Sequence, residues 1–446
     1  MPPRARWVPR AAAPTTYIHE LPADVSPLVG QLLWNRNITD PAQARPFLAA
    51  EYATLHDAFA LRDMERAVAR IRLAIEQQET VAVYGDFDTD GVTGVALLKQ
   101  ALSAFGLEVL PYIPKRLEEG YGLNMQAVEA LARQAQLLIT VDCGISNVAE
   151  IARAQALGLD VIVLDHHTPP AVLPQAYALI NPKRDGCAYP YKMLAGVGVA
   201  YKLTQALHRA GLRSGLKGRD LLDVVALGTV TDMAPLDGEN RVLVKHGLVA
   251  LNTTERPGIN ALIDAAAARR PVDARTIGFT LGPRINAAGR LDDAIRAYEL
   301  LLASSEPEAR RLADELNTIN LQRQTLTKDV QRAAHELAVA SGKHEQRVII
   351  LDRSDFPAGV VGLVAARLVE TFCRPVLLLE RGELTSRGSG RSIVGFSIID
   401  ALTEVGHLFQ KFGGHTMAAG FTISNAHLPE LEARLNAIAA RDLADD

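Results

Sequence analysis

Short apolar runs alternate with helical patterns between residues 80 and 181. The runs are VAVYGD (81–86), EVLPYI (108–113), LLITVD (137–142), VIVLDH (161–166) and YALIN (177–181). Helical patterns lie between most of them, as in residues 93–106 and 147–158. Strands that are apolar almost throughout and alternate with helices are typical of a parallel sheet covered on both faces. The pattern therefore predicts an α/β fold built on a parallel sheet.

A long helix and a second unit are predicted further along the chain. Residues 306–340 contain no glycine and no proline after Pro307, and their apolar residues repeat at spacings of three and four. This segment is predicted to be one helix that connects two domains. Further strands are predicted at 347–352 and 375–380, before a glycine-rich stretch at 382–420. The predicted division is an N-terminal arm with small helices (1–60), a sheet domain (61–250), a helical connector (251–340) and a second domain (341–446).

Composition narrows the class of protein. The chain has 446 residues, 48% hydrophobic and 22% charged, which is typical of a globular protein with two or three domains. No apolar run approaches the length of a membrane span, and the N-terminus lacks the apolar core of a secretory signal. Three scattered cysteines favour a reducing compartment, so we expect a cytoplasmic protein. Because the net charge is −4, a nucleic-acid partner would have to meet a local basic groove.

Acidic and imidazole side chains lie at the ends of three of the predicted strands or directly after them. They are Asp86, Asp88, Asp90, Asp142, Asp165, His166 and His167. In parallel sheets, ligands bind beyond the carboxyl ends of the strands. Carboxylates gathered there repel one another, and divalent cations remove that repulsion. Carboxylate and imidazole together suit Mn²⁺, Fe²⁺, Mg²⁺ or Zn²⁺, and two such ions side by side are the usual device for cleaving phosphate esters. The sequence therefore favours phosphoryl chemistry.

Other interpretations of these residues are weaker. A calcium loop beginning at Asp86 would have Gly91 at its sixth position, as required, but its twelfth position is Leu97 instead of glutamate. A solvated acidic turn is a second alternative for the three aspartates. A single histidine at a strand end is more often a hydrogen-bonding residue than a ligand, so the case depends on the whole set.

Serial motifs along the chain resemble those of a known superfamily. The motifs are GDFDTDG (85–91), VDCGIS (141–146), LDHH (164–167), LAGVGVAYKL (194–203), LGTVTDMAPL (227–236), LGPRINAAGRL (281–291), GSGRSI (388–393) and FGGHTMAAG (412–420). In their order from about residue 60 to 425 they resemble the DHH phosphoesterase superfamily. Within it, they are most similar to the family of RecJ exonucleases, which are specific for single-stranded DNA.

The resemblance implies a fold and an activity. The fold would be a parallel-sheet DHH domain joined by a long helix to a smaller α/β DHH-associated domain, with the active site in the cleft between them. The activity would be 5′-to-3′ hydrolysis of single-stranded DNA to 5′-mononucleotides with two Mn²⁺ or Mg²⁺ ions, in DNA repair and recombination. The alternative is another DHH phosphodiesterase that cleaves short oligonucleotides or cyclic dinucleotides. An inactive scaffold would have lost acidic ligands that this sequence retains.

Site residues also follow from the resemblance. One metal would take Asp86, Asp88 and Asp142. The second would take Asp90, Asp142, His166 and Asp232. His167 would face the scissile phosphate, and Asp165 would orient an imidazole, although capping of its strand end is an equal alternative for Asp165. Substrate-binding roles would fall to Arg116, Arg284, Asn286, Arg290, Ser389, Arg391, Gly414 and His415.

A local structure is expected for two of these substrate-binding segments. Residues 282–290 are expected to be a glycine-bounded loop that binds the phosphodiester backbone, and residues 388–391 an anion-binding nest of backbone N–H groups. RecJ exonucleases continue into an OB-fold that binds single strands, so we expect this chain to lack that region and to be less processive. A single-strand-binding protein and a RecQ-type helicase are possible partners, and a monomer is expected.

Overall fold

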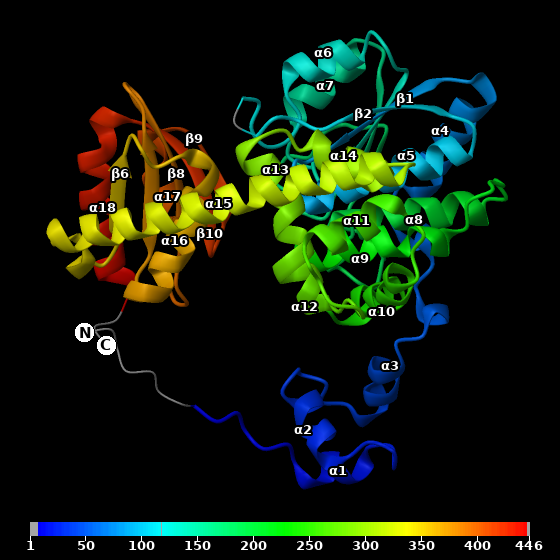
Figure 1. Cartoon of the computed structure of the whole chain (residues 1–446), viewed down its shortest axis with the longest axis horizontal. Helices are drawn as coiled ribbons and strands as arrows, with labels where there is room; N and C mark the ends of the chain where they lie inside the picture. Colours follow the sequence, from blue (N-terminus) through cyan, green and yellow to red (C-terminus); the bar gives the residue numbers. More distant parts are fainter. Residues whose placement is uncertain (1–7, 117, 444–446) are drawn as a thin grey trace. The chain divides into compact units, whose positions relative to one another are not determined.

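A computed structural model describes residues 8–116 and 118–443 (Figure 1). The chain divides into two compact units, one of residues 9–319 and the other beginning at Asn320. The helix α15 (Glu306–Ala340) runs across this division, with the bounds that the sequence predicts. The finer limits at residues 60, 250 and 340 stay predictions.

The first unit contains the predicted parallel sheet. Its strands are β1 (Thr80–Gly85), β2 (Glu108–Tyr112), β3 (Leu137–Val141), β4 (Asp160–Leu164) and β5 (Ala178–Ile180). All neighbours pair in parallel, in the order β2-β1-β3-β4-β5. The prediction of an α/β fold is therefore confirmed. The strand order reverses at β1, which has β2 on one side and β3 on the other. Such a switch point leaves a crevice beyond the carboxyl ends of the strands.

Helices account for most of the rest of this unit. They are α1 (Thr15–Glu20), α2 (Pro27–Trp34), α3 (Ala44–Ala49), α4 (Met64–Gln77), α5 (Thr89–Ala104), α6 (Met125–Leu131), α7 (Val148–Ala156), α8 (Gly196–Arg209), α9 (Leu222–Thr231), α10 (Gly238–Asn252), α11 (Pro257–Ala265), α12 (Ala274–Thr276), α13 (Gly282–Leu291) and α14 (Ile295–Leu302). Side chains alternate along β1 between two separate hydrophobic clusters, with Val81 and Val83 in one and Ala82 and Tyr84 in the other. Both faces of the sheet are therefore covered.

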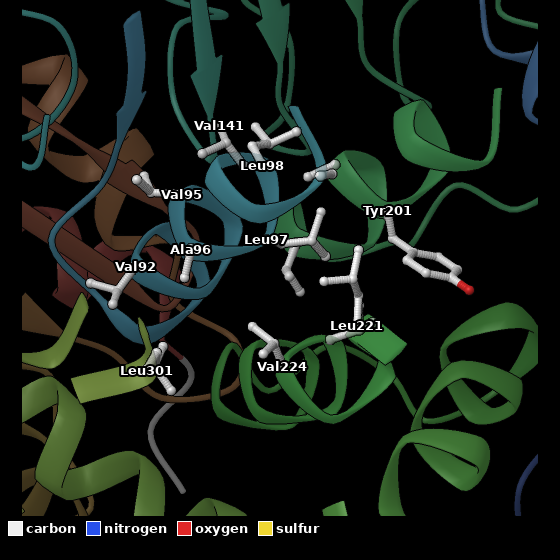
Figure 2. Close-up of a cluster of buried hydrophobic side chains, with 14 of the residues drawn as sticks. Val92, Val95, Ala96, Leu97, Leu98, Val141, Tyr201, Leu221, Val224 and Leu301 are labelled. Carbon is white, nitrogen blue, oxygen red and sulfur yellow. The ribbon is translucent and has the colours of Figure 1, made fainter. Parts of the chain in front are cut away.

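The helix α5 lies inside the larger cluster. Its first ten residues, from Thr89 to Leu98, are all buried. Figure 2 shows Val92 and Leu97 of α5 close to side chains of other helices, among them Val224 of α9 and Leu301 of α14. A helix that is apolar on every side belongs in a core. The residues at its N-terminus are therefore held firmly where β1 ends.

The second unit is a mixed α/β domain. Its strands are β6 (Ile349–Arg353), β7 (Val376–Arg381), β8 (Thr385–Arg391), β9 (Phe409–His415) and β10 (Ala418–Ser424), in the order β6-β7-β8-β10-β9. The pair β6–β7 is parallel, and the other pairs are antiparallel. The helices are α16 (Ala358–Phe372), α17 (Ile398–Glu404) and α18 (Leu428–Asp442). Of the five strands, the sequence predicts only β6 and β7.

None of the described helices is both long enough and apolar enough to cross a lipid bilayer.

Candidate metal centre

The predicted metal ligands gather at the switch point of the first sheet. Asp86, Asp88 and Asp90 follow β1, Asp142 follows β3, and His166 follows β4. Asp232 is the C-cap residue that directly follows α9, and it joins the group from outside the sheet. The structure thus brings together side chains from four separate segments of the chain.

Three sets of side chains in this cluster could each hold a metal ion. They are Asp86, Asp88 and Asp142; Asp90, His166 and Asp232; and Asp142, His166 and His167, each with ligand atoms within 4.8 Å of one another. Nε2 of His166 lies 3.0 Å from Oδ1 of Asp142 and 3.8 Å from Oδ2 of Asp90. The first set is the first predicted ligand group, and the second set is the second predicted group without Asp142. The residues fit divalent cations, because Oδ1 of Asp86 is buried and accepts no hydrogen bond.

Backbone N–H groups hold both oxygens of the Asp90 carboxylate in place. Oδ2 of Asp90 accepts a hydrogen bond from the N–H of Gly196 at 2.6 Å, and Oδ1 accepts one from Val197 at 2.9 Å. These N–H groups belong to the first turn of α8, where a negative charge is stabilised. A Cβ atom on Gly196 would lie 2.7 Å from Cβ of Asp142. Glycine therefore lets α8 approach both carboxylates closely.

Asp142 occupies an uncommon backbone conformation. Its φ angle is +61°, in the left-handed region that a non-glycine residue seldom adopts. The chain turns sharply here, directly after the last residue of β3. Strain of this kind persists where the surrounding structure enforces it, and it is frequent at functional sites.

Burial and mutual repulsion shift the pKa values of the carboxylates. Burial, and then the charge of Asp88, raise the pKa of Asp90 to about 7. Burial, and then the charges of Asp90 and Asp88, raise the pKa of Asp232 to about 9. The pKa values of Asp86 and Asp142 are raised for the same two reasons. Without a cation, this centre would retain protons at neutral pH.

The two histidines have opposite electrostatic environments. Burial, and then the charge of His167, lower the pKa of His166 to about 3. A neutral imidazole is the form that binds a metal. Burial alone would lower the pKa of His167, but the hydrogen bond and charge of Asp165 raise it to about 9. His167 is therefore an imidazolium at neutral pH, and His166 is neutral.

Two further residues at the centre were missed by the sequence analysis. The hydroxyl of Tyr121 lies 3.2 Å from Nδ1 of His167, and Gly120 and Gly122 on either side of it have positive φ angles. Lys183 follows β5, and its charge acts on Asp232 and Asp165. Tyr121 had no signal in the sequence. Lys183 had one, because it follows the fifth predicted strand, as the ligands follow three of the others.

Arg116 lies beside the acidic residues that follow β1. Its guanidinium carbon lies 4.9 Å from the centre of the Phe87 ring. Burial lowers the pKa of Arg116, and the charges of Asp86 and Asp88 oppose that shift. The structure thus places this predicted substrate-binding residue next to the carboxylates.

The segment expected to be a loop at residues 282–290 is instead helical. It forms α13, which continues a π-helical turn at Ile277–Leu281. Arg284 donates hydrogen bonds to Oδ1 of Asn317 at 3.0 Å and to the carbonyl of Thr280 at 2.6 Å. Oδ1 of Asn286 accepts hydrogen bonds from Thr89. Arg290, at the last turn of α13, is partly buried. Hydrophobic spacing, with Ile285 and Ala288 buried, favours the helix over the loop.

The segment expected to be an anion nest is also different. Residues 388–391 lie in β8, which pairs with β7 on one side and β10 on the other. Its backbone groups are therefore used by the sheet, and no nest of backbone N–H groups forms there. The side chains of Ser389 and Arg391 contact each other, with Nη1 of Arg391 2.8 Å from Oγ of Ser389. Gly414 and His415 lie at the end of β9, an edge strand paired with β10.

Cys143 stands next to Asp142, but its side chain lies in a hydrophobic cluster. Its side chain is fully buried in the hydrophobic cluster that contains Tyr84, Leu138 and Val163. Burial is the first cause that raises the pKa of this thiol, followed by the neighbouring negative charges. The thiol therefore has the environment of an apolar core residue, not that of a metal ligand.

Comparisons with known proteins define first the class and then the family. Residues 80–229 match the model of the DHH family, N-terminal domain, and residues 345–441 match that of the DHHA1 domain. The chain is 39% identical over 440 residues to the single-stranded-DNA-specific exonuclease RecJ of Salmonella typhimurium, covering 93% of this chain and 75% of that protein. The RecJ of Bacillus subtilis is 40% identical over 428 residues. The chain belongs to the RecJ family.

A solved structure agrees in fold. RecJ from Thermus thermophilus in complex with Mn²⁺ superimposes with a TM-score of 0.84 and 34% identity, over 96% of this chain and 61% of that one. A structure of the same Thermus protein with Mg²⁺ gives a TM-score of 0.76. The chain spans 53% of the Bacillus relative, or about half its length.

Proposed function

We propose that this chain is a metal-dependent exonuclease that hydrolyses single-stranded DNA from its 5′ end to 5′-mononucleotides, in DNA repair and recombination. The observation that carries the proposal is the buried cluster of carboxylates and imidazoles at the switch point, with three sets able to hold a metal. The names of the relatives supply the substrate class, because they are single-stranded-DNA-specific exonucleases.

The two ligand groups would each hold one divalent cation, Mn²⁺ or Mg²⁺. Asp86, Asp88 and Asp142 would hold one, and Asp90, Asp142, His166 and Asp232 the other. Such ions polarise a phosphodiester and lower the pKa of a bound water, which makes water a strong nucleophile at neutral pH. Because His166 has a lowered pKa, it is ready to act as a ligand without first losing a proton.

His167 is the group best suited to donate a proton or a hydrogen bond to the scissile phosphate. Its Nδ1 lies 2.8 Å from Oδ1 of Asp165, and as an imidazolium it donates to that carboxylate. The second N–H, at Nε2, is then the acidic group that can act on a phosphate oxygen or a leaving oxygen. Asp165 keeps the ring in this orientation and protonation state, as carboxylates that support histidines commonly do.

Cationic side chains would bind the strand. Arg116 lies beside the carboxylates, where an anionic phosphate would relieve the burial of its charge. Arg284 and Arg290 of α13 and Ser389, Arg391, Gly414 and His415 of the second unit are proposed to contact the strand through side chains or edge-strand backbone.

Cellular context belongs to the same proposal. We propose that the protein acts in the cytoplasm as a monomer. A single-strand-binding protein and a RecQ-type helicase are its proposed partners.

A nuclease assay with matched substrates tests the proposal. A 5′-phosphorylated, 3′-labelled single strand, the matching blunt duplex and a dinucleotide are incubated with Mn²⁺ and either the wild type or Asp142→Ala. Shortening of the single strand alone from its 5′ end, abolished in the variant, is the expected result. Cleavage of only the dinucleotide would assign the chain to the oligonucleotide phosphodiesterases of the superfamily. Equal activity in the variant would disprove the metal centre.

A further inference from the structure

Asn286 has a fixed partner within the metal centre. Its Oδ1 accepts a hydrogen bond from the backbone N–H of Thr89 at 2.8 Å and another from the Thr89 hydroxyl at 3.0 Å. Thr89 is fully buried, and it lies between Asp88 and Asp90. One carboxamide oxygen is therefore bound to the residue that separates two predicted metal ligands.

The bond to Thr89 completes the N-terminus of α5. The first N–H groups of a helix have no partner within the helix, and they must find one elsewhere. Oδ1 of Asp88 accepts from the N–H groups of Asp90 and Gly91, at 2.9 and 3.2 Å. The remaining N–H, that of Thr89, is satisfied by Asn286. Because Asn286 accepts the hydrogen bond from the N–H of Thr89, Oδ2 of Asp88 is not needed as its acceptor.

The same face of α13 touches the metal loop at a second point. Gly289 stands three residues after Asn286, which places both on one side of the helix. A Cβ atom on Gly289 would lie 2.5 Å from the carbonyl oxygen of Phe87. Phe87 lies between Asp86 and Asp88. The helix therefore contacts the segment 86–90 on both sides of Asp88.

We infer that Asn286 is a positioning residue for the metal loop and does not bind the strand. Its carboxamide fixes the N-terminal turn of α5, so that the carboxylates of Asp86, Asp88 and Asp90 keep the spacing that two cations require. The inference rests on the metal centre of the proposed function, and it assigns α13 a role within it. A small error in ligand placement lowers both metal affinity and catalytic rate.

Direct measurement of Mn²⁺ binding separates this role from strand binding. Calorimetric titration of Mn²⁺ into Asn286→Ala is expected to show affinity about tenfold or more below that of the wild type. The kcat on a single strand should fall, while the KM for the strand stays within about twofold. Asn436→Ala is the control, because its Oδ1 accepts from the N–H of Val348 at 3.0 Å in the second unit. It should keep wild-type Mn²⁺ affinity.

Variants of Thr89 keep the test decisive if Asn286→Ala fails to fold. Thr89→Ser retains both donors and should bind Mn²⁺ like the wild type, whereas Thr89→Val loses the hydroxyl and should bind it more weakly. Unchanged Mn²⁺ affinity with a tenfold higher KM in Asn286→Ala would overturn the inference and return Asn286 to strand binding. If the wild type binds Mn²⁺ but cleaves no DNA, the proposed function fails while the positioning role is still judged by the Mn²⁺ titrations.

Discussion

Asp165 and His167 form a hydrogen-bonded pair beside the metal centre. Oδ1 of Asp165 lies 2.8 Å from Nδ1 of His167 and also accepts from the backbone N–H groups of His166 and His167. Oδ2 accepts from the N–H of Ile145 at 2.9 Å. Burial alone would raise the pKa of Asp165, but its bond with His167 is the main cause that lowers it to about 2. Asp165 thus orients an imidazole and also caps its strand end.

Asp165→Asn should lower catalytic rate with little effect on metal binding. The amide keeps the shape of the side chain but removes the negative charge that raises the pKa of His167. We expect kcat to fall about 10- to 100-fold. The alkaline limb of the pH–rate profile should also move to lower pH, because His167 loses its proton sooner. Steady-state rates between pH 6 and 10 measure both effects. An unchanged profile would argue against His167 as the proton donor.

The metal-free protein should become less stable as pH rises. The pKa values of Asp90 and Asp232 are raised to about 7 and about 9, above the ordinary value of 3.8. The folded state therefore holds protons that the unfolded state has lost, and stability falls as pH rises through this range. In EDTA, the melting temperature should be lower at pH 8 than at pH 5.5.

Mn²⁺ and one substitution provide the controls for this pH effect. Saturating Mn²⁺ should raise the melting temperature more at pH 8 than at pH 5.5, because the cation binds the ionised carboxylates. Asp232→Asn should reduce the difference between the two pH values in EDTA. A metal-free protein whose melting temperature rises steadily with pH in both forms would contradict the repulsion described for this cluster.

The sequence predicts the first sheet well because each of its strands is a nearly continuous apolar run. All five of its strands were predicted to within about two residues, and the long helix to its last residue. The second sheet was harder to predict. The strands β8, β9 and β10 contain many glycines, such as Gly388, Gly390 and Gly413, and glycine disfavours strands. These strands form because they pair with β7 and with one another. A pattern within one short segment of the sequence does not show such pairing.

The sequence predicts those residues of the candidate site whose side chains indicate metal binding by their type and position. Acidic residues at strand ends converge because parallel strands bring their carboxyl ends to one edge. The N–H groups of Gly196 and Val197 that bind Asp90 had no such signal, since every residue has a backbone N–H. The contact of Asn286 with Thr89 had no signal either, because it joins residues 197 positions apart. A contact at that distance in the sequence depends on the tertiary fold.

Cys143 should be inert in the folded protein despite its place beside Asp142. Its thiol is fully buried, whereas Cys373 is exposed. A thiol reagent such as iodoacetamide should modify Cys373 quickly and Cys143 only after unfolding, because a buried thiol of raised pKa is a poor nucleophile. Peptide mass spectrometry after brief labelling measures the two sites separately. Cys373→Ser serves as the control, and rapid labelling of Cys143 in it would show that the core around β3 opens readily.

Arg116 is expected to contribute to strand binding more than to the chemical step. Its guanidinium is packed over the Phe87 ring, and among the described residues no carboxylate forms an ion pair with it within 4.0 Å. Arg116→Gln should raise the KM for a 5′-phosphorylated strand about tenfold or more, the usual effect of losing a charged hydrogen bond. The kcat should change much less, because the metal ligands stay in place.

A surface arginine provides the matched control for Arg116. Arg153 forms an exposed ion pair with Glu129, 2.8 Å apart, and Arg153→Gln should leave the KM unchanged, since such pairs contribute little. Calorimetry with Mn²⁺ separates the two ways in which Arg116→Gln could act. If Mn²⁺ affinity changes and the KM does not, Arg116 offsets the repulsion between Asp86 and Asp88. If the KM rises at constant Mn²⁺ affinity, the guanidinium of Arg116 is used to hold a phosphate of the strand.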